Sequence, residues 1–130
     1  MDKKFTKSEW SRKSPLYLEK SDARFKFHLK QLKSNGFSDS ETWALDSVIC
    51  KFILPRLIRF KKIAGGYPMG LTSKEWDEIL DKIIFAFYFS NNCDEGEFNN
   101  CDEETKSLNW VRYEEGMQLF AKWFRNLLVI

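Results

Sequence analysis

The chain has 130 residues, a formal net charge of +2, and 43% hydrophobic and 16% aromatic residues. This length predicts one domain, and the apolar content excludes a chain that is disordered throughout. The small net charge disfavours extended nucleic acid as a partner, because domains that bind it usually carry a large basic excess.

We expect residues 1–20 to form a basic N-terminal segment and residues 21–130 to form a helical domain. Residues 1–34 contain ten Lys or Arg against four Asp or Glu. The first residues are charged and lack the apolar region of a signal peptide. The longest apolar run, 83–89, is too short to span a bilayer, so no membrane partner is expected. The three cysteines are predicted to stay reduced, in the cytoplasm.

The first predicted helix begins near Ser21-Asp22 and ends near Ser34. Its apolar residues Phe25, Leu29 and Leu32 recur at the spacing of one helical stripe. The Asn35-Gly36 pair that follows is typical of a helix end in the left-handed conformation.

A second helix is predicted after the capping box Ser38–Glu41. Its apolar side chains fall on one predicted face: Leu45, Val48, Ile49, Phe52 and Ile53. Pro55 cannot donate a backbone hydrogen bond, so the helix should kink or break at Leu54-Pro55.

A glycine-rich turn at 65–70 precedes a third helix, which starts at a second capping box, Thr72–Glu75, and reaches about Phe89. It is apolar nearly all round and is expected to pack against the helix that carries Pro55. An acidic loop is predicted at 91–105, then a last helix to about Leu128 in which Gly116 permits close approach of another helix. No segment alternates as a strand does. The prediction is an all-α fold: one compact domain of four to five helices with a Pro-kinked central helix.

Four segments carry a resemblance: ETW-x-LD from Glu41, FILPRL-x-RFK from Phe52, GYP-x-GLT from Gly66 and EWDEILDK from Glu75. They resemble segments of a family of small, uncharacterised proteins of tailed bacteriophages. The resemblance covers roughly residues 28–128. It implies a helical fold and a viral origin inside a host cell, hence the host cytoplasm, and it implies no site.

No catalytic, metal-binding or nucleotide-binding motif is present, so we expect neither an enzyme nor a bound cofactor or metal. His28 is the only histidine, which excludes a site with two histidine ligands. The acidic loop lacks the twelve-residue pattern of a calcium loop. Phosphate-binding glycine loops are absent as well.

The strongest binding candidate combines cations with aromatic rings. Arg56, Arg59 and Lys62 recur every third residue, and arginine grips phosphate bidentately. Trp43 and Tyr67 could stack on a base. The alternative is that the arginines pair with Asp77, Asp81 or the acidic loop and only cover the core.

The expected function is binding by a phage anti-defence protein. In the first hypothesis the protein sequesters an anionic nucleotide signal of the host in a basic, aromatic pocket. In the second it inhibits a host defence or transcription factor by binding that protein. The many aromatic residues also predict a homo-oligomer, since a chain of 130 residues cannot easily bury them all.

Overall fold

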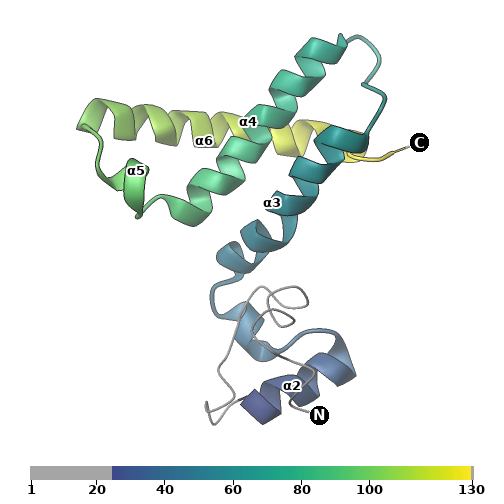
Figure 1. The fold of residues 1–130 in the computed structure, drawn as a ribbon, viewed down its shortest axis with the longest axis vertical. Coiled ribbons are helices and arrows are strands. Elements are labelled where there is room, and N and C mark those ends of the chain that lie inside the picture. Colours follow the sequence, from purple (N-terminus) through teal and green to yellow (C-terminus); the bar gives the residue numbers. More distant parts are fainter. Residues whose placement is uncertain (1–24, 130) are drawn as a thin grey trace. The chain divides into compact units, whose positions relative to one another are not determined.

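The computed structural model describes residues 25–129, of which 78% are helical and none lies in a strand. The predicted all-α fold is therefore confirmed. The described elements follow in chain order (Figure 1): α2 (Phe25–Asn35), η2 (Asp39–Thr42), α3 (Leu45–Ile63), α4 (Ser73–Asn92), α5 (Gly96–Asn99), α6 (Glu103–Trp123) and η3 (Phe124–Asn126). The chain divides into two units, 1–51 and 52–130, which are described separately. The predicted basic segment 1–20 lies outside the described residues.

In the N-terminal unit, α2 buries Phe25 and Leu29, as its apolar stripe predicts. The helix ends as predicted: the Gly36 N–H donates to the Leu32 carbonyl at 2.9 Å, and Gly36 has a φ of 83°. His28 lies off the predicted stripe, yet only 2% of it is exposed. The buried surface of α2 therefore extends beyond the predicted stripe.

The first capping box starts a shorter element than predicted. The Ser38 N–H donates to the Glu41 carboxylate at 2.7 Å, and both residues are buried. The turn that they cap is the 3-10 helix η2, and α3 begins only at Leu45. The motif was identified correctly, but the start predicted for the long helix was wrong.

Helix α3 is continuous across Pro55, so a break at Leu54-Pro55 is excluded. Because Pro55 has no N–H, the Lys51 carbonyl lacks its usual helical donor. At the next carbonyl, that of Phe52, the Arg56 side chain donates a hydrogen bond of 2.7 Å. The buried side of the helix includes Leu57, whereas Phe52 on the predicted apolar face is 53% exposed.

In the C-terminal unit, the extensive partner of α4 is α6 and not α3, contrary to the sequence prediction. Edge-to-face ring pairs join the two helices: Trp76 with Trp123 at 5.9 Å and Phe89 with Trp110 at 4.9 Å. The two helices run in opposite directions, because the early rings of α4 meet the late rings of α6. Helix α4 supplies most of the core: Trp76, Leu80, Ile83, Ala86, Phe87 and Phe89 are buried.

Helices α4 and α6 approach each other closely at Gly116. It is buried, and a Cβ built on it would overlap the Lys82 carbonyl oxygen and lie 2.5 Å from the Ala86 Cβ. The close approach predicted for this glycine is confirmed. Next to it, Lys82 and Glu115 form an exposed ion pair at 3.2 Å.

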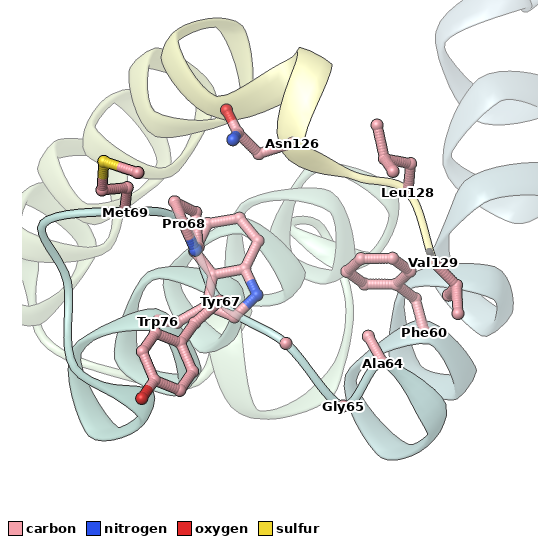
Figure 2. A pocket seen from close by; sticks show the side chains of 11 residues that line it. Phe60, Ala64, Gly65, Tyr67, Pro68, Met69, Trp76, Asn126, Leu128 and Val129 are labelled. Atoms are coloured by element: carbon pink, nitrogen blue, oxygen red, sulfur yellow. The ribbon is translucent and has the colours of Figure 1, made fainter.

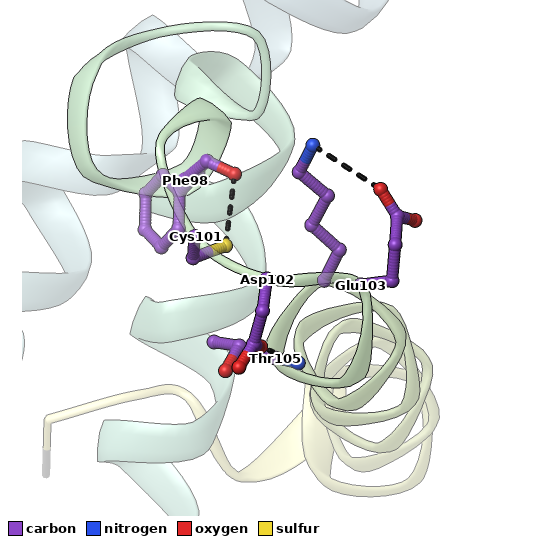
Figure 3. A network of polar contacts seen from close by, with 6 residues as sticks. Phe98, Cys101, Asp102, Glu103 and Thr105 are labelled. Atoms are coloured by element: carbon purple, nitrogen blue, oxygen red, sulfur yellow. Dashed lines mark hydrogen bonds and ion pairs between the residues drawn. The ribbon is translucent and has the colours of Figure 1, made fainter.

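The acidic segment contains the short helix α5 and then the start of α6. Asp102 caps α6 by accepting the Thr105 N–H at 2.7 Å (Figure 3). Hydrogen bonds from the side chain and the backbone of Thr105 hold the pKa of Asp102 below its ordinary value of 3.8. The Cys101 thiol donates to the Phe98 carbonyl, which joins α5 to this cap. The segment is thus a folded connection with local hydrogen bonds.

Within the described part of the chain, no three metal-binding side chains come together. None of the described helices combines the length and the apolar character that a bilayer span requires.

Candidate functional site

One pocket of the C-terminal unit has a volume of about 400 Å³. It lies where the end of α3, the turn that follows it, the start of α4 and the chain after α6 meet (Figure 2). Volumes of this order are typical of small-molecule sites. Eleven residues line it: Phe60, Ala64, Gly65, Gly66, Tyr67, Pro68, Met69, Trp76, Asn126, Leu128 and Val129.

The walls of this pocket are apolar and aromatic. Trp76 is buried, and Tyr67 and Leu128 are about half exposed. Figure 2 places Met69 and Val129 at opposite ends of the site. Asn126 supplies the one side-chain amide of the lining, and no charged side chain takes part. Such walls suit a flat, apolar ring with a polar edge.

Of the predicted site residues, Tyr67 lines this pocket and Arg56 does not. The guanidinium carbon of Arg56 lies 3.8 Å from the centre of the Phe52 ring. The same side chain donates to the Phe52 carbonyl. Arg56 is therefore held on its own helix by a cation–π contact and a hydrogen bond.

Arg59 and Lys62 are exposed, and neither side chain has an ion pair or a hydrogen bond within residues 25–129. Arg59 adjoins Phe60 in the pocket wall, about 100° away around the helix. Lys62 lies about 160° from Phe60, on the far side of α3. Arg59 is thus the predicted cation nearest to the pocket along the helix.

The alternative prediction paired Arg56 and Arg59 with Asp77, Asp81 or the acidic loop. Among residues 25–129 neither arginine forms such an ion pair, and Lys61 pairs with Asp81 instead. Lys61 Nζ lies 2.7 Å from Asp81 Oδ1. This hydrogen bond raises the pKa of Lys61 above its ordinary value of 10.5. This exposed pair joins α3 to α4 and does not involve Arg59.

Trp43 belongs to the N-terminal unit, so the structure does not group it with the pocket. It is 57% exposed, and its ring lies 5.3 Å from that of His28, nearly perpendicular to it. The Nδ1 atom of His28 is buried and finds no hydrogen-bond partner among the described residues.

Sequence reasoning missed the pocket walls that come from the end of the chain. Asn126 and Leu128 are more than fifty residues away from Tyr67, and no motif links the two segments. The one available signal was the aromatic and glycine content of the turn at 65–70.

No family model and no solved structure matches this chain. Part of the chain is similar to an F-box/kelch-repeat protein of Arabidopsis thaliana, at 33% identity over 60 residues. Those residues make up 46% of this chain and 15% of the plant protein. The match therefore concerns a short stretch of a much longer protein and assigns no family.

Proposed function

We propose that the protein is a non-enzymatic binding protein of phage origin that sequesters an anionic nucleotide signal in the host cytoplasm. The nucleobase enters the 400 Å³ pocket formed by the turn at 65–69 and the chain end at 126–129. One observation carries the proposal: in an aromatic pocket with a single side-chain amide, a lining residue on each of two segments follows directly after an exposed arginine in the sequence.

The base binds through its faces and its edge. Tyr67, Phe60 and Trp76 offer aromatic surface, and stacking on such a ring is worth about 1–3 kcal/mol per base. The Asn126 amide has donors and an acceptor, as the edge of a base does. A base therefore uses both the apolar walls and the one polar side chain of the lining.

The phosphate stays outside the apolar pocket, where water and arginines are available. Arg59 precedes Phe60, and Arg125 precedes Asn126, so each adjoins a lining residue. Both are exposed, and the described residues supply neither with an ion pair. The proposed site differs from the predicted one. Arg59 and Tyr67 are kept, and Arg125 and Asn126 are added. The proposal no longer includes Arg56, Lys62 and Trp43.

Mass spectrometry of small molecules released by denaturing protein from infected cells tests the proposal first. Calorimetry then compares the four nucleoside 5′-monophosphates with their nucleosides. We expect Arg59→Ala to weaken binding of the preferred monophosphate about tenfold or more, as one charge-assisted hydrogen bond is lost. Binding of the matching nucleoside should change little.

A variant that fills the pocket tests whether the ligand binds there. Gly66 has open space where a Cβ would stand, so Gly66→Leu is compatible with the fold and places its side chain at the pocket. It should abolish binding, whereas Lys74→Ala, on the exposed start of α4, should not affect it. Full binding by Gly66→Leu would place the ligand elsewhere.

A second candidate function is inhibition of a host defence or transcription factor by direct binding. It is favoured by exposed apolar side chains on α6, where Leu108 is 56% exposed and Val111 is 63% exposed. Neighbours three apart on a helix form a continuous surface. Pull-down of a host protein that Leu108→Glu no longer captures would support this function.

A further inference from the structure

A smaller pocket lies at the other end of the α4–α6 pair, and the proposed nucleotide site does not involve it. Its volume is about 190 Å³, enough for one small head group. Three rings from three elements line it: Phe89 of α4, Phe98 of α5 and Trp110 of α6. Cys93, Asp94, Asn99 and Lys106 complete the lining.

The rings meet at right angles. The Phe89 ring makes interplanar angles of 90° with Phe98 and 85° with Trp110, at centroid distances of 5.0 and 4.9 Å. Rings set perpendicular to one another present faces in different directions, as in the aromatic cages that bind methylated ammonium groups.

The same aromatic cluster already holds a cation on one of its faces. The guanidinium carbon of Arg112 lies 3.8 Å from the centre of the Phe85 ring. Phe85 in turn stacks on Phe89, with centroids 5.8 Å apart and planes 10° apart. A ring of this cluster outside the pocket lining is therefore in contact with a guanidinium group.

The segment that supplies four of the seven lining residues is acidic. The segment 91–105 contains six acidic residues and no basic one, and Asp94 lies in the lining itself. Burial and then the Asp94 carboxylate raise the pKa of the Cys93 thiol, which lies in the same lining. Lys106 is the opposing charge, and its ammonium pairs with Glu103 at 3.6 Å (Figure 3).

We infer that this pocket binds an organic cation, the ammonium or guanidinium head of a ligand, with Phe89, Phe98 and Trp110 as aromatic walls and Asp94 as counter-charge. Such a head group comes either from a basic side chain of a polypeptide or from a free small molecule. Lys106 limits the affinity because it repels the incoming charge.

The test is an NMR titration of the ¹⁵N-labelled full chain, read at the Trp110 indole N–H and the Asn99 amide. Methylguanidinium and tetramethylammonium represent free cations, and a neutral peptide with one central arginine represents a polypeptide source. Methylurea is the uncharged analogue of methylguanidinium. We expect saturable shifts with the cations and none with methylurea at equal concentration.

Variants of the two charged lining residues should change the affinity for the cation in opposite directions. Asp94→Asn should weaken cation binding roughly fivefold, and Lys106→Gln should strengthen it by a similar factor. Glu104→Gln removes one negative charge from the same segment outside the lining and should leave binding within about twofold. Trp110→Leu, checked by circular dichroism for an unchanged helix content, should abolish the shifts of the Asn99 amide.

Comparison of the peptide with the free cations also identifies the source of the cation. Tighter binding of the arginine peptide than of methylguanidinium supports a polypeptide, and the reverse order supports a free small cation. Equal binding of methylurea and methylguanidinium overturns the inference, since the pocket would then select for shape alone. Absence of shifts at Trp110 with every cation overturns it as well.

Discussion

Gly116 of α6 packs directly on Ala86 of α4, at a separation that leaves no room for a Cβ on the glycine. The Lys82 backbone carbonyl closes the same space. We predict that Gly116→Ala lowers the free energy of unfolding by on the order of 1–2 kcal/mol. Overpacking costs about 1–3 kcal/mol, and overlap with a backbone carbonyl should place Gly116 in the upper part of that range. The gain of about 1 kcal/mol in helix propensity therefore offsets only part of the cost. Urea unfolding measures the difference.

A double-mutant cycle with Ala86→Gly tests the cause. Removing the Ala86 methyl relieves one of the two overlaps, so the double variant should be less destabilised than the sum of the single variants. Gly65→Ala is the control, because nothing lies within 4 Å of the position that its Cβ would take. An unchanged stability of Gly116→Ala would contradict the close approach.

The helices of this chain were largely predictable, and their partners were not. Caps and stops are local: Thr72–Glu75 and Asn35-Gly36 act within a few residues, so the sequence contains the whole cause. Packing is not local. The sequence predicted that α4 would bury its apolar surface against α3. In the structure α4 packs on α6 instead, because Gly116 lets the two backbones approach closely.

The candidate site was predictable only in part, for the same reason. Tyr67 was identified because aromatic and glycine residues cluster in its turn. Asn126 was missed because its place beside that turn depends on where the chain end folds. Arg56 has the sequence features of a phosphate ligand, but the neighbouring Phe52 ring and the carbonyl near Pro55 occupy it instead.

The cap of α4 should contribute measurably to stability. The Glu75 N–H donates to Thr72 Oγ1 at 3.1 Å, and the Thr72 N–H donates to the Glu75 carboxylate at 2.9 Å. Thr72→Ala should lower the free energy of unfolding by about 1 kcal/mol, because one backbone donor of the first turn loses its acceptor. Chemical denaturation measures this. Ser73→Ala, one residue inside the helix, should change stability much less.

Stability should depend on pH through Asp102. Its pKa is lower in the folded protein than in the unfolded chain, so its ionised form stabilises the fold at pH values above about 3.8. That contribution should disappear as the pH falls below 3.8 through the lower folded pKa. Asp102→Asn keeps an oxygen for the Thr105 N–H but does not titrate in this range. Between pH 2 and 6 the free energy of unfolding should therefore depend less on pH in the variant than in the wild type. An identical pH dependence of the two proteins would contradict the role of Asp102.

The exposed apolar residues of α6 predict self-association. Leu108 and Val111 lie one turn apart and are more than half exposed. Light scattering at tens of micromolar should give a mass above that of the monomer, and Leu108→Glu with Val111→Glu should return the protein to a monomer. Arg112→Gln lies next to this surface and is the control for a change in charge. A wild-type monomer at these concentrations would exclude the homo-oligomer.

Arg56 and Arg59 are three residues apart on α3, yet they should respond oppositely to mutation. Arg56→Ala removes the cation–π contact with Phe52 and a donor to its carbonyl, at a cost of about 0.5–1 kcal/mol for the ring contact at an exposed site. The melting temperature of Arg56→Ala should fall, while its affinity for the preferred nucleoside monophosphate should stay near that of the wild type. Arg59→Ala should leave the melting temperature unchanged, because no described residue pairs with it, and should weaken nucleotide binding about tenfold or more. Measuring melting and binding on both variants separates a structural arginine from a ligand contact. If Arg59→Ala instead melted lower and bound normally, the phosphate would have to sit away from α3.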